Sequence, residues 1–266
     1  MIRTIRAELL KLRRPAVLYG GAGAMLGFGL LATVLTFATA TATPGNSPVG
    51  GDALTSTVSQ LGQSGGMTRG FTIAAGFIGL LAFVLFTTSV TSEYGLGTIR
   101  VMLVRQPRRA RLLSGKLLAL LVCVAAVLLA AELISSAAAF AMAPGKGIST
   151  GNWLTAEGMR LFVGNYANAV LTATFFGTIG AVVGVLARST PLALGLGLAW
   201  LGPIEHIVQL NWDGAGGWFP GLVFDAVASG GTTVITYQHA TTMAAVYLAV
   251  AMLGGTASFV RRDVSV

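Results

Sequence analysis

A glycine-rich stretch contains the one pattern in this chain that is typical of a nucleophilic enzyme. Residues Gly62 to Gly66 read GQSGG, which places Ser64 in the GxSxG pattern of serine hydrolases. That chemistry needs the serine on a strained turn or inside a membrane span, with a histidine within hydrogen-bond reach. Ser64 instead precedes a long apolar run, and His206 and His239 follow much later. Glycine-rich loops produce this pattern readily, so an intramembrane serine protease ranks third among the functions considered.

Phosphate and metal chemistry find less support in the sequence. The stretches 113–116 and 144–146 suggest a phosphate-binding loop, but neither has a glycine five residues before its lysine or a Ser or Thr directly after it. The two histidines and the single cysteine, Cys123, form no cluster with metal-ligand spacing. We therefore expect no enzyme activity, no cofactor and no metal in this chain.

The composition is that of an integral membrane protein. Hydrophobic residues make up 54% of the 266 residues and charged residues only 10%, whereas a soluble domain has about 25% charged residues. The mean hydropathy is +0.78. We expect an all-helical fold in one transmembrane domain that covers residues 1–266.

The elements that must position any functional side chain are apolar helices. A hydrocarbon core of about 30 Å needs roughly 20 apolar residues in a helix. Six stretches meet this requirement, and the third contains Glu132 while the fifth ends in Glu205 and His206. The predicted spans are 15–40, 70–90, 117–143, 166–187, 191–210 and 240–260.

The basic residues predict the orientation of these spans, since short cytoplasmic loops retain Lys and Arg. If the N-terminus is cytoplasmic, 14 of the 17 Lys and Arg residues fall on that side. Both termini should then be cytoplasmic, in a multi-pass protein of the cell membrane. The same alternation explains the net charge of +8 without nucleic acid, which we do not expect as a partner.

The first 14 residues predict an amphipathic helix. Ile2, Ile5, Leu9 and Leu12 recur at helical spacing, with basic residues off that stripe. Such a helix should lie in the inner membrane interface. A signal peptide is the competing explanation, but the following apolar run of about 25 residues is longer than a signal core of roughly 7 to 15.

A second basic segment, residues 92–116, separates spans two and three and carries six of the basic residues. Gly95 and Gly97 can break a helix and Thr98 can cap a new one, so a short helix is expected over about Thr98 to Arg105, before Pro107 interrupts the chain. A solvated loop that only retains positive charge is the alternative. The apolar face of the predicted helix would contain Ile99, Met102 and Leu103, with Arg100 and Arg105 beside it.

Three stretches of the sequence, taken in their order relative to the spans, match the pattern of a known family. They are the amphipathic start with Glu8, Lys11, Arg13 and Arg14, the loop with Ser92-Glu93-Tyr94, Gly97-Thr98, Pro107-Arg108-Arg109 and Gly115-Lys116, and the terminal Phe259-Val260-Arg261-Arg262-Asp263. In these features the chain resembles the membrane subunits of type 2 ATP-binding-cassette exporters. The likeness covers the six-span layout, and the central loop is its most specific part.

The resemblance implies a function for the basic segment. In that family this loop holds a coupling helix that docks on a separate ATPase, and the N-terminal helix packs beside it. The partners would be two ATPase chains, which bind ATP and Mg, and a second permease chain, with a homodimer favoured over a heterodimer. Glu93 would brace the docking region. The implied interface residues are Glu93, Gly97, Thr98, Ile99, Arg100, Met102, Leu103, Arg105, Arg108 and Arg109.

A non-transporting membrane protein, such as an immunity or sensor subunit, is the main alternative to an exporter. An ATPase gene beside this one would favour the exporter. The transported substrate does not follow from the sequence.

Polar residues within the spans are candidates for the export path or for contacts between helices. Glu132 is the only acid well inside a span, where a charge costs about 2.5 to 3.5 kcal/mol on insertion scales. Counting along the spans predicts Asn168 and Thr172 at a comparable depth, where either could donate a hydrogen bond to it. Glu205 and His206 belong to the same group. The segment 211–239 should form short helices that dip into the outer leaflet, as the resembling family does.

Overall fold

The computed structural model describes residues 20–41, 56–98 and 109–261. In these ranges the chain is helical apart from its turns and one isolated β-bridge between Thr41 and Thr57. Uncharged stretches of this length form helices in an apolar environment because a helix satisfies every backbone N–H and C=O within the segment.

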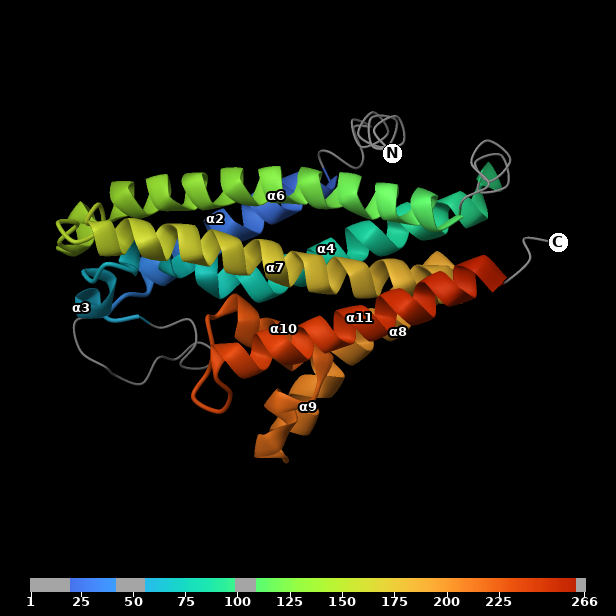
Figure 1. Cartoon of the computed structure of the whole chain (residues 1–266). Helices are drawn as coiled ribbons and strands as arrows, with labels where there is room; N and C mark the ends of the chain where they lie inside the picture. Colours follow the sequence, from blue (N-terminus) through green and yellow to red (C-terminus); the bar gives the residue numbers. More distant parts are fainter. Residues whose placement is uncertain (1–19, 42–55, 99–108, 262–266) are drawn as a thin grey trace.

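Six of the helical segments are long and apolar enough to cross a membrane, which confirms the predicted number. The main helices alternate in direction, and Figure 1 shows them side by side in one elongated bundle. They are α2 (Gly23–Ala38), α4 (Arg69–Gly95), α6 (Arg109–Met142), α7 (Ala156–Ala187), the pair α8 (Thr190–Ala199) and α9 (Glu205–Gln209), and α11 (Tyr237–Arg261). We call the end where α4 ends and α6 begins the loop end, and the opposite end the far end.

Helices α4, α6, α7 and α11 extend beyond the predicted spans, most of all α7 in the fourth. Span four was predicted to begin at residue 166, but α7 begins at Ala156. The prediction stopped at charged residues, whereas Glu157 and Arg160 lie one turn apart on α7 and form an exposed ion pair of 2.7 Å. Thr155 caps this helix, since its hydroxyl accepts a hydrogen bond from the Gly158 N–H.

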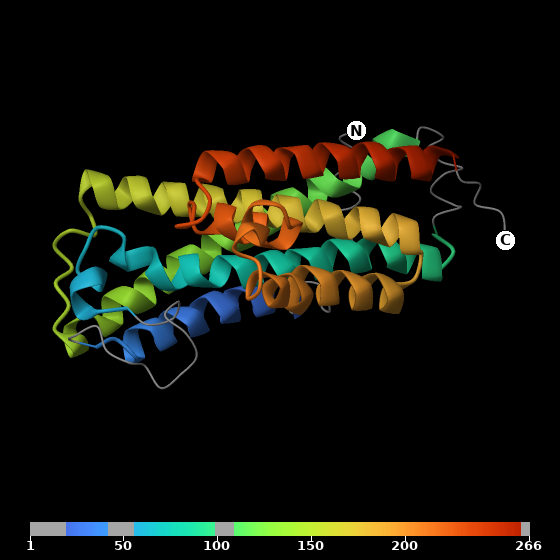
Figure 2. The same ribbon diagram turned by 90° about the horizontal axis from the view of Figure 1, so that it is seen from below.

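Helices α4 and α7 form the centre of the bundle. Helices α2 and α6 pack beside this pair, while α11 lies along α7 and α8 lies along α4 (Figure 2). Two glycines of α7 bring the central helices together: a Cβ on Gly180 would lie 2.5 Å from the Phe83 carbonyl oxygen, and one on Gly184 would lie 3.3 Å from the Thr87 carbonyl oxygen. The GxxxG spacing on α7 therefore serves packing within the chain.

Short elements close the far end around a buried tryptophan. Trp153 is fully buried, contacts Phe37 and Phe140 edge to face, and donates a hydrogen bond from Nε1 to the Leu61 carbonyl oxygen at 2.9 Å. Leu61 is itself fully buried, so this part of the Gly/Ser/Thr/Pro-rich stretch 41–66, whose composition is typical of an exposed loop, belongs to the core. The elements here are α3 (Val58–Leu61), η2 (Gly66–Thr68) and η3 (Pro144–Lys146).

The segment between the last two spanning helices folds onto the bundle. It contains η5 (Asp213–Gly217) and the nine-residue helix α10 (Pro220–Ala228), which packs against α4, α7 and α11. Phe224 of α10 is fully buried and its ring contacts the rings of Phe175 and Phe176. The apolar composition of this segment, which is unusual for a loop, is explained by this burial.

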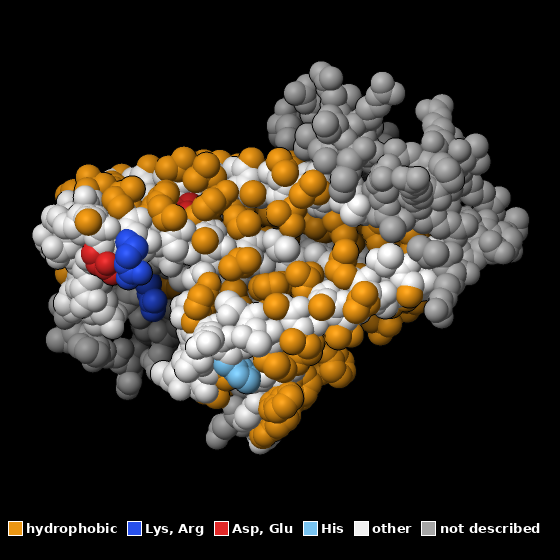
Figure 3. All heavy atoms as spheres, viewed as in Figure 1, with side chains coloured by type: hydrophobic (Ala, Val, Ile, Leu, Met, Phe, Trp, Pro, Cys, Tyr) orange, Lys and Arg blue, Asp and Glu red, His pale blue; other side chains and the backbone are white. Residues whose placement is uncertain are grey.

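The outer surface of the bundle is apolar along its length. Figure 3 shows hydrophobic side chains over most of the visible face, with most of the visible charged groups near the far end. Leu196 of α8 and Leu253 of α11 are 64% and 73% exposed. Exposed apolar side chains on all sides are typical of helices in contact with lipid.

Candidate functional site

Most of the predicted coupling interface lies outside the described residues. The predicted N-terminal helix also lies outside the described residues. Arg109 is the first residue of α6, but its side chain is not among those described. The residues outside are Glu8, Lys11, Arg13, Arg14, Ile99, Arg100, Met102, Leu103, Arg105 and Arg108. The structure does describe Glu93, Gly97 and Thr98, which form the base of the loop.

The chain turns sharply where α4 ends. Gly97 has a φ of +66°, in the left-handed region that favours glycine, and its N–H donates to the Tyr94 carbonyl oxygen at 3.1 Å. The Thr98 hydroxyl donates weakly to the Glu93 carbonyl oxygen at 3.4 Å. The helix therefore ends at Gly95, and Gly97 turns the chain directly after it.

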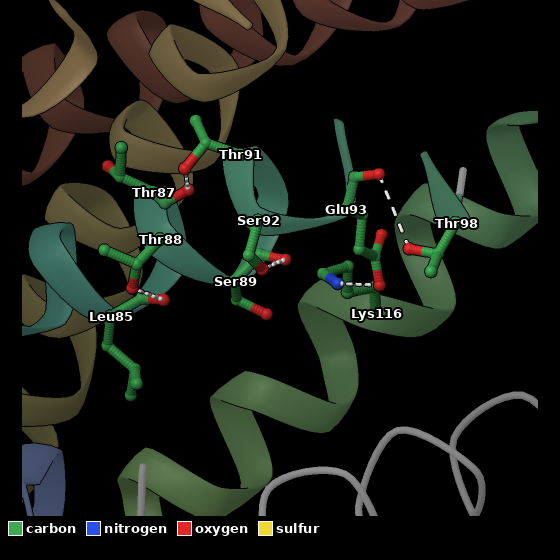
Figure 4. A network of polar contacts seen from close by, with 9 residues as sticks. All are labelled: Leu85, Thr87, Thr88, Ser89, Thr91, Ser92, Glu93, Thr98 and Lys116. Carbon is green, nitrogen blue, oxygen red and sulfur yellow. Dashed lines mark hydrogen bonds and ion pairs between the residues drawn. The ribbon is translucent and has the colours of Figure 1, made fainter. Parts of the chain in front are cut away.

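A buried ion pair joins the two helices that flank the loop. Lys116 Nζ of α6 donates to Glu93 Oε1 of α4 at 2.6 Å (Figure 4). The two side chains are only 7% and 14% exposed. Charge-assisted hydrogen bonds of this kind are stronger than neutral ones, so the pair holds the end of α4 against the first turns of α6.

Two further contacts connect this point to α7 and α8. The hydroxyl groups of Thr91 and Thr190 are 2.7 Å apart, which joins α4 to the start of α8. The Arg188 guanidinium lies over the Tyr94 ring, 5.6 Å from its centre. Arg188 ends α7 in the left-handed conformation, with a φ of 54°. Four helices thus meet at the base of the loop.

A second group of polar residues surrounds a wide turn in the fifth span. Five residues, Trp200–Ile204, form the π-helical turn η4, which contains Pro203. Proline has no N–H to donate to the preceding turn, so it favours such an irregularity. The next residue, Glu205, is fully buried, and its Oε2 accepts a hydrogen bond from the Leu222 N–H at 3.1 Å. A carboxylate at this place stabilises the N-terminus of α10.

Gly221 allows this contact, and its substitution gives a first prediction. A Cβ on Gly221 would lie 2.6 Å from both Glu205 Oε2 and the Leu201 carbonyl oxygen. We expect Gly221→Ala to lower the free energy of unfolding by roughly 2 kcal/mol through overpacking. Thermal unfolding of the purified chain in detergent would measure it. Gly254→Ala, where nothing lies within 4 Å, is the control, and equal stability of the two variants would contradict the argument.

His206 and Asp225 lie next to one another in the wall of a cavity. His206 Nε2 lies 3.6 Å from Asp225 Oδ2, and its Nδ1 lies 2.8 Å from the Gly202 carbonyl oxygen, to which it donates. Asp225 reaches the surface of α4 at Gly76, where a Cβ would lie 2.6 Å from Asp225 Oδ1. The cavity between α4, the η4 turn and α10 has a volume of about 770 Å³.

The Glu132 carboxylate is fully buried, and among the described residues neither of its oxygens has a hydrogen-bond partner. The predicted donors bond elsewhere. Asn168 Oδ1 accepts from the Tyr237 hydroxyl at 2.7 Å, and the Thr172 hydroxyl donates to the Phe224 carbonyl oxygen at 3.4 Å. The predicted contacts of Glu132 with Asn168 and Thr172 are therefore wrong.

The helix register explains this error. The Tyr166 hydroxyl of α7 donates to the Ala125 carbonyl oxygen of α6 at 3.1 Å, which fixes the relative heights of the two helices. From that level the antiparallel helices carry Glu132 towards the far end, and Asn168 and Thr172 towards the loop end. At 1.5 Å per residue the separation along the bundle is roughly 10 Å or more.

The comparison with known families adds one assignment. A model of the family described as "Protein of unknown function (DUF2705)" matches residues 56–265, which is most of the chain. The chain belongs to this family. No curated protein matches it. The matched region of this DUF2705 chain contains both the loop base and the cavity, so both sites belong to the part shared with the family.

Ser64 of this DUF2705 chain lies in a packed turn at the far end. Among the described residues its hydroxyl has no hydrogen bond to a histidine, and His206 and His239 contact the carbonyl oxygens of Gly202 and Gly217. The glycines of the motif have a packing role, because a Cβ on Gly66 would lie 1.8 Å from the Leu61 carbonyl oxygen. No group of three potential metal ligands occurs within the described ranges.

Sequence reasoning missed three residues of the cavity. Arg69 is one of the three basic residues outside the cytoplasmic set, and Gly76 lies within the predicted span 70–90. Asp225 could pair with a neighbour in the segment 211–239, but the sequence does not say which. Pro203 is the one sequence signal that could have pointed to this region, because a proline inside a span predicts an irregular turn and freed backbone groups.

Proposed function

We propose that this chain is the transmembrane subunit of an ATP-driven exporter of the type 2 ATP-binding-cassette class. Residues 91–116 would couple it to a separate ATPase, and the helices would form the substrate path. The proposal rests on the resemblance of the loop and on one observation, the buried Glu93–Lys116 pair at the base of that loop.

A coupling loop must pass displacement to the helices rather than absorb it. A loop attached by flexible segments would absorb a push from a partner. Here the Glu93–Lys116 pair joins α4 to α6, and the Thr91–Thr190 contact joins α4 to α8. A displacement of the loop would therefore move several helices together, which is the mechanical requirement for coupling ATP binding to opening of a path.

The proposal also includes the orientation of the chain in the membrane and its partner chains. The loop end would face the cytoplasm with both termini, and residues 1–14 would lie in the inner interface. Helix α10 would be re-entrant from the outer leaflet. Two ATPase chains with ATP and Mg and a second permease copy would complete the exporter in the cell membrane. Exporters of drugs, antimicrobial peptides, lipids and ions share this layout.

Reversal of the loop charges tests this proposal. We expect Arg100→Glu combined with Arg105→Glu to reduce the ATPase that co-purifies with the tagged chain from native membranes at least tenfold, because like charges across an interface cost several kcal/mol. Mass spectrometry and ATP hydrolysis in the eluate would measure it. The control reverses two charges at the far end, Lys146→Glu and Arg160→Glu. The absence of any ATPase with the wild-type chain, or its retention in the loop variant, would refute the proposal.

A further inference from the structure

The cavity between α4, η4 and α10 has the size and form of a ligand site. Its volume of about 770 Å³ falls in the range of roughly 300 to 1,000 Å³ that small-molecule sites occupy. Three separate elements enclose it, and none of the contacts described at the loop end involves it. Most of its wall is apolar, and its polar groups are few, as is usual for such sites.

The cavity wall on α4 changes from charged at the far end to apolar towards the middle of the bundle. On α4 the wall begins with the exposed Arg69 at the far end and continues through Ile73 and Gly76 to Leu80. At 1.5 Å per residue Gly76 lies roughly 10 Å, and Leu80 roughly 16 Å, deeper than Arg69. Leu198 of α8 lines the wall opposite these residues. A ligand that fits this gradient has one polar group and an apolar tail.

The polar group at the middle depth is the Asp225 carboxylate. Its side chain is one-third exposed, and it lines the cavity, so this exposed part is accessible to a ligand. The 3.6 Å separation from His206 Nε2 is an ion-pair distance but too long for a hydrogen bond. In the described part of the chain no hydrogen bond to this carboxylate is found, so its oxygens can accept a contact from a bound cation.

The other charged groups near the cavity leave Asp225 as the ligand contact. Arg69 lines the same cavity, roughly 10 Å from Gly76 along α4. Glu205 is fully buried and directed to the Leu222 N–H. His206 carries a charge only when protonated. Asp225 is therefore the carboxylate of this cavity that a cationic group can contact.

We propose that this cavity binds an amphiphilic organic cation, with its ammonium group at Asp225 and its apolar chain along Phe77, Leu80 and Leu198. Phe77 contributes an aromatic ring to the same wall, and quaternary ammonium groups are attracted to aromatic faces. The inference deepens the proposed function and rests on it only in taking the bound cation as a transported substrate. Binding itself requires neither ATP nor a partner chain.

Protonation of Asp225 should control binding. Burial raises the pKa of this carboxyl to about 6, and the nearby His206 opposes the rise. The carboxyl is then ionised at pH 7.5 and protonated at pH 5. Since only the ionised form attracts a cation, binding should weaken as the pH falls through about 6.

Binding of dodecyltrimethylammonium to the full chain in lipid nanodiscs tests the inference. This probe stays cationic at every pH, so a pH effect reports on the protein. At pH 7.5 we expect saturable binding above the partition into empty nanodiscs, weakened at least tenfold by Asp225→Asn, which removes a charge contact. Gly76→Ala should weaken it while the acid is retained. The controls are Glu157→Gln, an exposed acid, and Gly164→Ala, where a Cβ meets nothing within 4 Å.

Each result of this experiment decides the question. Wild-type binding that weakens at pH 5, together with Asp225→Asn binding that does not change with pH, would support the site. The inference is overturned if saturable binding is absent, if Asp225→Asn binds as the wild type does, or if dodecanol competes as well as the cation. If Asp225→Asn does not fold, Gly76→Ala and the wild-type pH dependence give the answer. None of these results affects the co-purification of an ATPase, which tests the proposed function separately.

Discussion

Replacement of Lys116 with methionine is expected to lower the free energy of unfolding by about 3 kcal/mol. Methionine keeps the apolar part of the side chain but removes the ammonium group, so Glu93 loses a 2.6 Å contact in a place where it is only 14% exposed. Titration of the detergent-solubilised chain with SDS, followed by circular dichroism, would measure the change.

Two variants separate this pair from general effects of substitution. Glu93→Gln combined with Lys116→Met removes both charges, and we expect it to recover most of the lost stability because no carboxylate is then left without the Lys116 ammonium beside it. Arg160→Met removes one partner of the exposed Glu157 pair and should have little effect. A Lys116→Met variant as stable as the wild type would show that the pair does not hold the loop base.

Gly180→Ala is expected to produce the second large effect, a loss of about 3 kcal/mol of stability from overpacking. The added methyl group would lie 2.5 Å from the Phe83 carbonyl oxygen and 2.7 Å from Thr87 Oγ1. The backbone oxygen cannot rotate away, so α4 and α7 would have to separate along the centre of the bundle. The same SDS titration applies.

Gly27→Ala is the matched control for this substitution. Gly27 lies inside α2, and nothing is found within 4 Å of a Cβ there. Alanine should leave stability unchanged or slightly raised, since it favours a helix over glycine by up to about 1 kcal/mol. Gly184→Ala should lie between the two, with its closest contact at 3.3 Å. Equal effects at Gly180 and Gly27 would contradict a role of Gly180 in helix packing.

The number of spans followed from the sequence because lipid imposes a strict requirement on length and charge. The ends of the helices could not be predicted in this way, since a helix continues wherever the hydrogen bonds of its backbone are satisfied. The ten residues before position 166 show this: Glu157 and Arg160 neutralise one another on an exposed turn of α7, so their charge did not end the helix. The break at Gly97 was predictable because few other residues adopt its backbone conformation.

The sites that depend on contacts between helices did not follow from the sequence. Depth counted from predicted starts placed Asn168 beside Glu132, but the register between α6 and α7 is set by packing. The meeting of His206 with Asp225 likewise depends on how α10 folds back. Gly76 and Gly221 resemble any other glycine in a span or loop until a neighbouring side chain defines their role.

The unequal lengths of two neighbouring helices determine how far the loop stands from the lipid. Lys146 Nζ donates to the Ala38 carbonyl oxygen at 2.8 Å, so α2 and α6 are level at the far end. The apolar run that contains α2 begins only at Pro15, whereas the 34 residues of α6 extend roughly 51 Å. A hydrocarbon core is about 30 Å thick, so the first turns of α6 would project roughly 10 Å or more beyond it. At that height a bulky protein could approach the start of α6 from the side without displacing headgroups.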